Sequence, residues 1–416
     1  MQLSTKRIMK YLFTMSVLIA AITMFAGCSS NDDDVPNPDG DGNGSNTNPI
    51  EISSDIISDT VLTDRGDGVD YIFCGGIIVK AALTIDPGVK IAMCADANIW
   101  VEDEGSFYAV GTEDAPIIIE GKEHTKGYWG NIDFRTNDPD NQIAYAQIRD
   151  GGGNGGSDAI IYLTSINNAQ LSLTHTTIAN SKKIGLHVDF GGATLSDFVD
   201  NHFKDNGTYP VQIPLNRMGQ LDAATDYGDH NGKNLIATKN GDDLNKDMTI
   251  PAANVPYFID QFWNVKEGIT LKPGTHFVMG SEAAIVIEDD GFLNAEGTAE
   301  DSISIVGKVD AAGYWNSITF QTNNPKNVMK YVTISNGGSD AGYSDHSSIY
   351  VNGLYNAQLI LQHSTIRDSY SWGLYVDDGA TITPGSVSDL EDTNTFTNNG
   401  TGTDADCDGD CNVLIE

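Results

Sequence analysis

A long internal duplication is the feature that most constrains the fold of this chain. Residues 83–152 align with residues 269–338 at a constant offset of 186 and without a gap, and 29 of the 70 aligned pairs are identical. Shorter matches extend the similarity on both sides of these segments. A chain that repeats in this way builds one structural unit twice, and each unit packs against its neighbour along the chain.

Each copy consists of short apolar runs separated by Gly, Asn and Asp, as at residues 117–119, 160–162 and 171–173. No segment has a sustained helical period. The runs recur at roughly 20–28 residues, which is the length of one turn of a β-solenoid. A pair of β-sandwiches, one per copy, is the alternative fold. The absence of a linker between the copies, near Asp247, counts against it.

Five motifs follow one another in the first copy. They are residues 83–88, residues 99–105, Gly111-Thr112, Gly127-Tyr128-Trp129 and Ile132-x-Phe134. This order resembles that of right-handed parallel β-helix surface lipoproteins of the Bacteroidota type, and the resemblance covers residues 59–416. It implies an all-β, right-handed parallel β-helix, here of two tandem copies of about 186 residues. It implies no activity, because this fold carries many unrelated functions.

The first 27 residues have the pattern of an export signal. Basic residues precede an apolar stretch over residues 12–26, which is shorter than the ~20 residues a spanning helix needs. Residues 25–28 (FAGC) resemble the lipobox of bacterial lipoproteins, in which the Cys is acylated. We therefore expect a signal peptide over 1–27, lipidation of Cys28 by palmitate-type acyl chains, and anchoring in the outer membrane. An ordinary signal peptide with an incidental Cys is the alternative.

Residues 28–50 are expected to form an acidic tether rich in Gly, Asn and Pro. Its acidic run at residues 32–34 resembles the surface-export signal of the same lipoproteins, which predicts exposure at the cell surface. We expect the body to comprise β-helix copy 1 over 51–246 and copy 2 over 247–416, as one continuous solenoid.

The net charge of the chain limits the classes of molecule that it can bind. It has 58 acidic and 23 basic side chains and a formal net charge of −35. Such a surface repels a polyanion, so binding to nucleic acid is excluded as a function. An extracellular glycan or another surface protein remains as the expected partner.

Four cysteines remain beside Cys28, and an exported protein can form disulfides. Cys74 and Cys94 are about one coil apart, and both are absent at the equivalent positions Asp260 and Gly280. A bridge between them is favoured over two buried thiols. Cys407 and Cys411 are also candidates for a disulfide.

The second copy carries an acidic insertion around these last two cysteines, with carboxylates at Asp404, Asp406, Asp408 and Asp410. Alternating carboxylates before a Gly resemble the first half of an EF-hand loop, which would bind Ca²⁺. Ile415 occupies the place of the last ligand, so a solvated acidic loop stays the alternative. The acidic turns at 102–104 and 288–290 allow the same two interpretations, a calcium site or a solvated turn.

Catalytic patterns are scarce. A lyase on this fold typically needs a basic residue beside carboxylates that hold calcium, and Arg135 and Arg149 are the arginines considered for that role. Asp377-Asp378 is the best carboxylate pair for glycoside hydrolysis, with a surface turn as the plainer interpretation. His175 and His363 follow Leu-x-Leu-x, so alternation places them inward as structural residues.

Aromatic residues offer a second route to function. Trp129 and Trp315 are expected to pack inside, although exposure would make them platforms for sugar rings. The aromatic side chains favoured for ligand contact are Tyr343, Tyr370 and Trp372.

These features favour a non-catalytic surface β-helix that binds an extracellular glycan or protein, as an adhesin does. A calcium-dependent carbohydrate-active enzyme, either a polysaccharide lyase or a glycoside hydrolase, is the first alternative. A purely structural envelope protein is the second.

Overall fold

The structure, a computed structural model, describes residues 48–153, 158–241, 244, 246–339, 344, 346–402, 407 and 411–416. The chain separates into two units, Met1–Gly44 and Ser45–Glu416, and every described residue belongs to the second. Within this unit the described residues form 39 short strands. Among them no helix is both long and apolar enough to cross a membrane.

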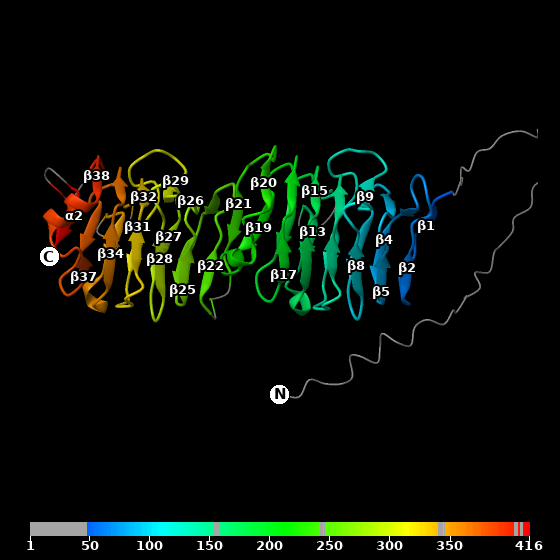
Figure 1. Cartoon of the computed structure of the whole chain (residues 1–416), viewed down its shortest axis with the longest axis horizontal. Helices are drawn as coiled ribbons and strands as arrows, with labels where there is room; N and C mark the ends of the chain where they lie inside the picture. Colours follow the sequence, from blue (N-terminus) through cyan, green and yellow to red (C-terminus); the bar gives the residue numbers. More distant parts are fainter. Residues whose placement is uncertain are drawn as a thin grey trace, which may run out of the picture. The chain divides into compact units, whose positions relative to one another are not determined.

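Each coil of the unit contains three strands, and each strand pairs in parallel with its counterpart in the next coil. Strand β2 (Thr60–Leu62) is followed by β3 (Tyr71–Phe73) and β4 (Gly76–Val79), and β5 (Ala82–Ile85) then pairs with β2. Figure 1 shows the coils following one another along the longest axis. This arrangement confirms the predicted right-handed parallel β-helix of two tandem copies.

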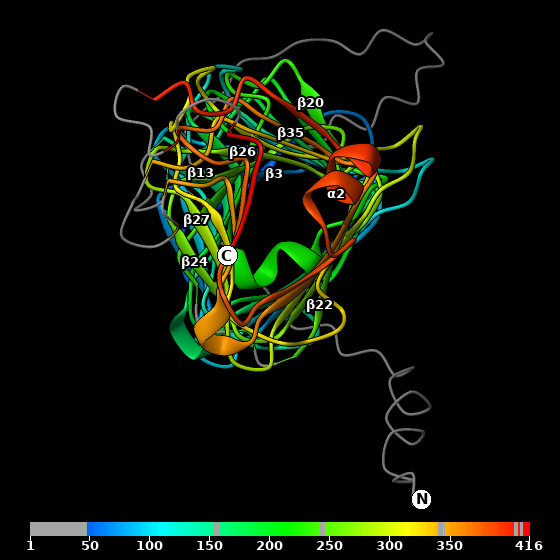
Figure 2. The same ribbon diagram turned by 90° about the vertical axis from the view of Figure 1, so that its left-hand side faces the viewer.

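The strands line three sides of the solenoid, which Figure 2 shows end-on: β3, β20, β26 and β35 lie on one side, β13, β24 and β27 on another, and β22 on the third. Side 1 comprises β1 (Ile50–Ile52), β3, β6 (Lys90–Met93), β9 (Ile117–Gly121), β12 (Ala146–Arg149), β15 (Thr177–Ala179), β18 (His202–Lys204), β20 (Asp226–Asp229), β23 (Tyr257–Ile259), β26 (His276–Met279), β29 (Ile303–Gly307), β32 (Val332–Ser335), β35 (Thr365–Arg367) and β38 (Thr395–Thr397). Side 2 comprises β4, β7 (Asn98–Val101), β10 (Ile132–Phe134), β13 (Ala159–Leu163), β16 (Ile184–Val188), β19 (Val211–Pro214), β21 (Ile236–Lys239), β24 (Phe262–Val265), β27 (Ala284–Ile287), β30 (Ile318–Phe320), β33 (Ile349–Val351), β36 (Leu374–Val376) and β39 (Val413–Ile415).

Side 3 comprises β2, β5, β8 (Ser106–Val110), β11 (Gln142–Ala144), β14 (Gln170–Thr174), β17 (Thr194–Val199), β22 (Met248–Ile250), β25 (Gly268–Leu271), β28 (Phe292–Glu296), β31 (Val328–Lys330), β34 (Gln358–Gln362) and β37 (Thr381–Thr383). Three short 3-10 helices complete the coils: η1 (Ile166–Asn168), η2 (Leu215–Gln220) and η3 (Gly353–Tyr355).

Hydrogen bonds cross the junction between the copies. Strand β21 of side 2 pairs with β23 of side 1, with Ile236 opposite Tyr257. The resulting sheet of 13 strands runs from β4 to β38. On side 3, η2 contacts both β17 and β22. The two copies therefore share one ladder of strands.

The interior is filled by ladders of identical or similar side chains. Ile99, Ile132, Ile161 and Leu186 follow one another on side 2, and all four are fully buried. Such stacking gives each coil an apolar layer on both of its faces, so a single coil is not stable alone.

Trp129 and Trp315 are fully buried, as expected from packing rather than sugar stacking. The indole Nε1 of Trp129 donates to the carbonyl of Arg149 at 2.7 Å, and that of Trp315 donates to the carbonyl of Ser335 at 2.7 Å. Each Trp thus closes the corner between side 1 and side 2 with its polar atom satisfied.

The inward placement of His175 and His363 was wrong. Both side chains are exposed, because each residue has a left-handed backbone, with φ of 49° and 52°, directly after the last residue of a strand. A left-handed corner residue interrupts the alternation on which that prediction relied. The rings stack on Tyr145 and Tyr331 of the preceding coil instead.

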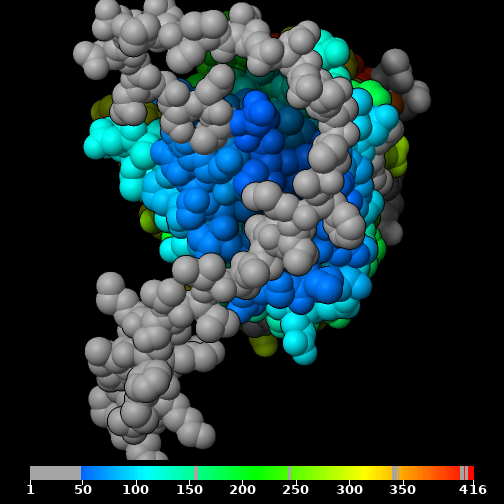
Figure 3. All heavy atoms as spheres, turned by 90° about the vertical axis from the view of Figure 1, so that its right-hand side faces the viewer, coloured from blue at the N-terminus to red at the C-terminus, as the bar shows by residue number. Residues whose placement is uncertain are grey.

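The two ends of the solenoid differ. At the C-terminal end, helix α2 (Val387–Thr393) buries Leu390 completely, and the hydroxyl of Ser386 accepts a hydrogen bond from the amide of Asp389 at its first turn. Figure 2 shows this helix at the end of the stack. Figure 3 faces the opposite end, where the first coils, in blue, form the terminal surface.

Candidate functional site

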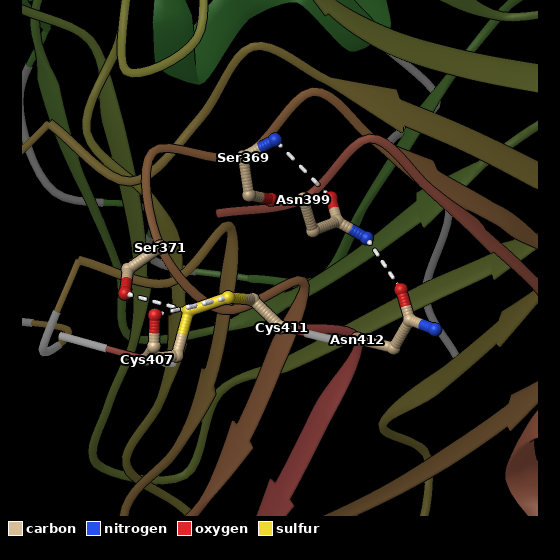
Figure 4. The surroundings of a disulfide bond; sticks show 6 residues. All are labelled: Ser369, Ser371, Asn399, Cys407, Cys411 and Asn412. Atoms are coloured by element: carbon tan, nitrogen blue, oxygen red, sulfur yellow. Dashed lines mark hydrogen bonds between the residues drawn. A yellow bond between two sulfur atoms is a disulfide. The ribbon is translucent and has the colours of Figure 1, made fainter. Parts of the chain in front are cut away.

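The predicted calcium loop lies largely outside the described residues, because Asp404, Asp406, Asp408 and Asp410 are not among them. The two cysteines that flank the loop are described, and the structure joins Cys407 to Cys411 in a disulfide. Figure 4 shows this bond beside Ser371, whose hydroxyl lies 3.7 Å from the sulfur of Cys407. The Ca²⁺ site itself stays a prediction.

Two of the three aromatic residues predicted to contact a ligand are among the described residues. Tyr343 lies outside the described residues. Tyr370 is half-buried, and its ring stacks on that of His346 with the centroids 4.8 Å apart. Trp372 is half-buried. Neither Tyr370 nor Trp372 lines the grooves described below.

Cys74 and Cys94 are joined by a disulfide, and their Cα atoms are 4.9 Å apart. The bond ties two neighbouring coils together just after β3 and β6. In the second copy the carboxylate of Asp260 occupies the space at Gly280, where any Cβ would overlap it. The Asp–Gly pair therefore fills the position that the disulfide fills in the first copy.

The acidic turns are paired with basic side chains. Asp103 lies 3.5 Å from the ammonium group of Lys80, and Glu288 lies 3.8 Å from that of Lys266. These contacts supply counter-charge to the turns, and Ca²⁺ binding at the turns stays a prediction.

Arg135 and Arg149 lie on different sides of the solenoid and do not converge. Arg149 is on side 1, where its Nε donates to Glu120 at 2.7 Å. Arg135 directly follows β10 on side 2 and bonds Glu102 of an acidic turn. A lyase site that combines both arginines is therefore not formed.

Side 2 of the first copy presents an outward ladder of polar and aromatic side chains. Trp100, Asp133, Tyr162 and His187 occupy directly paired positions on β7, β10, β13 and β16. The ladder borders a groove of about 400 Å³. We call it the Asp133 groove, and it is lined chiefly by Asn98, Trp100, Asp133, Arg135, Tyr162 and Asp189.

Asp133 is the most unusual group in the groove. Its side chain is only 6% exposed, and both Nε and Nη2 of Arg135 donate to the same oxygen, Oδ2, at 3.1 and 2.8 Å. The other oxygen, Oδ1, is buried and has no hydrogen-bond partner among the described residues. Burial raises the pKa of Asp133 above its ordinary value, although Arg135 acts in the opposite direction. A buried, unsatisfied acceptor of this kind calls for a donor from a ligand or water.

Aromatic rings stand on both sides of this carboxyl group. Trp100 lies over the backbone of Gly76, where any Cβ would overlap the indole. The guanidinium carbon of Arg135 lies 5.8 Å from the Trp100 ring centroid. Across the groove, the hydroxyl of Tyr162 donates to Asp189 at 3.3 Å. Burial, together with the charge of Asp189, raises the pKa of Tyr162 to about 12, so the hydroxyl keeps its proton.

The second copy keeps only part of this arrangement. Tyr350 and Asp377 repeat the Tyr162–Asp189 contact, at 3.1 Å. The positions of Trp100, Asp133, Arg135 and His187 are instead occupied by Val286, Thr319, Gln321 and Tyr375. Both copies form the same β-helix, so the scaffold itself does not need the charged and indole side chains of the Asp133 groove.

Sequence reasoning missed this groove, although one signal was available. Asp133 stands between two inward residues in the motif Ile132-x-Phe134, and the equivalent motif of the second copy has Thr319 at that place. Comparing outward positions between the copies would have marked Asp133 and Trp100. Their proximity was not predictable without the register, because they lie 33 residues apart in sequence.

Comparisons of the chain with family models, with curated proteins and with solved structures found no match. The function must therefore be argued from the geometry alone. The Asp133 groove offers aromatic faces, a buried acceptor oxygen, a guanidinium group and further carboxylates within one shallow depression. That combination suits a ligand with many hydroxyl groups and apolar C–H faces.

Proposed function

We propose that the protein binds an extracellular glycan in the Asp133 groove. The unsatisfied Oδ1 of Asp133 carries this proposal, because a sugar hydroxyl can donate to it. Trp100 and Tyr162 supply aromatic surface against which a pyranose can pack, although the ring of His187 lies 5.0 Å from that of Tyr162 and covers one of its faces. Arg135 and Asp189 supply fixed polar partners. The second copy lacks Trp100, Asp133 and Arg135 at the equivalent positions, although it keeps the Tyr–Asp contact, and this difference supports a role of the three residues in binding rather than in folding.

The groove favours a neutral glycan over an acidic one. Three carboxylates, those of Glu102, Asp133 and Asp189, lie on or beside it. Among the described residues Arg135 is the one basic side chain that lines it, and it is already paired with two of these carboxylates. An anionic sugar would therefore meet net negative charge.

The proposal includes display at the cell surface. The pattern of residues 1–28 supports export and acylation of Cys28, and the tether over 28–50 would hold the solenoid away from the outer membrane. An anchored solenoid presents long lateral faces to the medium, which suits the capture of an extended glycan.

Glycoside hydrolysis is the second candidate, and one observation favours it. The pKa of Asp133 is raised, as the general acid of a glycoside hydrolase requires, and Asp189 lies in the same groove. Asp189 would be the second carboxylate that an inverting or retaining hydrolase needs. Calcium-dependent catalysis stays a separate proposal.

One screen tests both functions. The purified chain is titrated against neutral and acidic polysaccharides, with and without Ca²⁺, and both binding and release of reducing ends are measured. Binding of a neutral glycan without release supports the binding function. Release of reducing ends that is lost in Asp133→Asn would replace it with hydrolysis. No binding to any polysaccharide would contradict the proposal.

A further inference from the structure

A second groove, of about 550 Å³, lies on side 1 of the first copy and carries a different set of groups. Its floor is formed by outward residues of β12, β15 and β18, with the small side chain of Ala179 between Arg149 and Lys204. His202 lies in the neighbouring row, paired with Thr177 on one side and with Asp226 on the other.

Two carboxylates meet the imidazole of His202 at one end of this groove. Its Nε2 lies 2.8 Å from Oδ2 of Asp229 and 3.6 Å from Oδ2 of Asp226. The ligand atoms of all three residues lie within 4.8 Å of one another. His230 contacts the second oxygen of Asp229 through Nδ1. The three candidate ligands are therefore His202, Asp226 and Asp229, and His230 only contacts the oxygen of Asp229 that does not face His202.

A β-bulge creates this arrangement. Asp226 and Asp229 are three residues apart, so regular alternation would place their side chains on opposite faces of β20. The register shifts between the pairs His202–Asp226 and Lys204–Asp229, and both carboxylates then face His202. Tyr227 between them is fully buried, which holds the bulged strand against the core. Bulges commonly re-aim side chains beside functional sites.

We propose that His202, Asp226 and Asp229 bind a divalent metal ion of the zinc class. A nitrogen lone pair directed at two carboxylates is repelled unless a proton or a cation stands between them, and a single proton on Nε2 can serve only one of the two. Ligand atoms about 2.1 Å from a tetrahedral Zn²⁺ lie about 3.4 Å apart, which the observed 2.8 and 3.6 Å bracket. The imidazole selects Zn²⁺, Co²⁺ or Ni²⁺ over Ca²⁺ and Mg²⁺, which take oxygen ligands.

The other histidine cluster of the same groove is a weaker site and serves as an internal control. His124 lies 3.1 Å from Asp150 and 3.8 Å from Glu120. Here the guanidinium group of Arg149 already bonds Glu120, and the amide of Asn180 donates to Asp150 at 2.6 Å. The Oε2 of Glu120 that faces His124 is thus already bonded by a guanidinium group, which an ion would have to displace. In the His202 cluster, the amides of Asn254 and Gly228 donate to Oδ1 of Asp226 rather than to the Oδ2 that faces His202.

The test is a titration of the purified, tag-free full chain with Zn²⁺, and with Co²⁺ as a spectroscopic probe. We expect one tight site per chain, with visible Co²⁺ absorption bands that report a nitrogen–oxygen ligand set. His202→Gln and Asp229→Asn are each expected to weaken binding at least tenfold. His124→Gln is the matched control, and it should leave the tight site unchanged.

The opposite pattern overturns the proposal. The His202 site would be excluded if no Zn²⁺ bound at concentrations up to the millimolar range. It would also be excluded if the tight site survived His202→Gln, or if His124→Gln abolished it. Circular dichroism of each variant separates a lost ligand from a lost fold. The glycan proposal is independent, because the Asp133 groove lies on side 2 and shares none of these residues.

Discussion

Arg135 and Asp133 are paired through one carboxylate oxygen only: two nitrogens of the guanidinium group reach Oδ2, and Oδ1 is left buried without a partner among the described residues. The contact with Arg135 holds the carboxyl group of Asp133 in the groove and leaves Oδ1 able to accept a hydrogen bond from a ligand. This relationship is absent from the second copy, where Thr319 and Gln321 stand at the same positions.

The pH dependence of stability reports the burial of Asp133. Its pKa is raised above the ordinary value in the folded state, so the protonated form contributes stability at low pH, and this contribution is lost as the pH rises through the folded pKa. The free energy of unfolding of the wild type, relative to Asp133→Asn, should therefore fall as the pH rises above about 3.9, the ordinary pKa of an Asp carboxyl group. Urea denaturation at several pH values measures it. A difference that grows with pH would show that Arg135 outweighs burial.

The equivalence of the two copies can be tested by moving the disulfide. Asp260 and Gly280 occupy the positions of Cys74 and Cys94, so the double substitution Asp260→Cys and Gly280→Cys should form a bond spontaneously. A closed loop of this length adds about 3 kcal/mol to the free energy of unfolding. Thiol titration and denaturation under oxidising and reducing conditions measure the outcome. Two free thiols in the folded variant would contradict the equivalence.

Buried asparagines stabilise the corners between coils, and Asn206 is the clearest case. Its side-chain oxygen accepts from the amide of Ser181 at 3.1 Å, and its amide donates to the carbonyl of Ile178 and to Asn231. Asn399 repeats the contact with the amide of Ser369 in the second copy (Figure 4). Asn206→Ala leaves buried groups unsatisfied and should cost about 2–4 kcal/mol of unfolding free energy.

The matched control for Asn206→Ala is Asn323→Ala, at an exposed position, which should change stability by less than about 0.5 kcal/mol. Thermal or chemical denaturation of both variants compares them. Equal effects of the two substitutions would argue against a special role for the corner asparagines.

Lys204 predicts the direction in which Zn²⁺ affinity should change when its charge is removed. Its ammonium group lies 3.8 Å from Oδ2 of Asp229 and competes with a bound cation for that carboxylate. Lys204→Gln removes this competing charge, so Zn²⁺ affinity should rise by about two- to fivefold at low ionic strength. Calorimetric titration of the two proteins shows the change. Unchanged or weaker binding in Lys204→Gln would place the ion elsewhere.

The fold was predictable because it follows from patterns that are local or repeated. The duplication and the short apolar runs favoured a solenoid over a pair of β-sandwiches, whatever the detailed register. Strand alternation failed to predict the placement of His175 and His363, because a left-handed corner residue reverses the face on which its side chain lies. The longest coils also exceed the expected spacing: Tyr108 pairs with Gln142, 34 residues later, because a long segment separates β9 from β10.

The candidate site was not predictable because the coils that form it have unequal lengths. Trp100, Asp133 and Tyr162 come from three successive coils whose lengths differ, so only the register places them in one row. The residues favoured from sequence were aromatic or acidic residues in loops of the second copy, and several of them lie outside the described residues. Composition and motif reasoning favours such loops, whereas the groove lies on the flat side of a sheet.

The most direct test of the central claim is a comparison of Trp100→Ala with Val286→Ala, its counterpart in the second copy. Isothermal titration calorimetry measures the affinity of each variant for the neutral glycan that the screen identifies. We expect Trp100→Ala to weaken binding at least tenfold, with Val286→Ala within twofold of the wild type. Equal affinities for all three proteins would contradict glycan binding in the Asp133 groove.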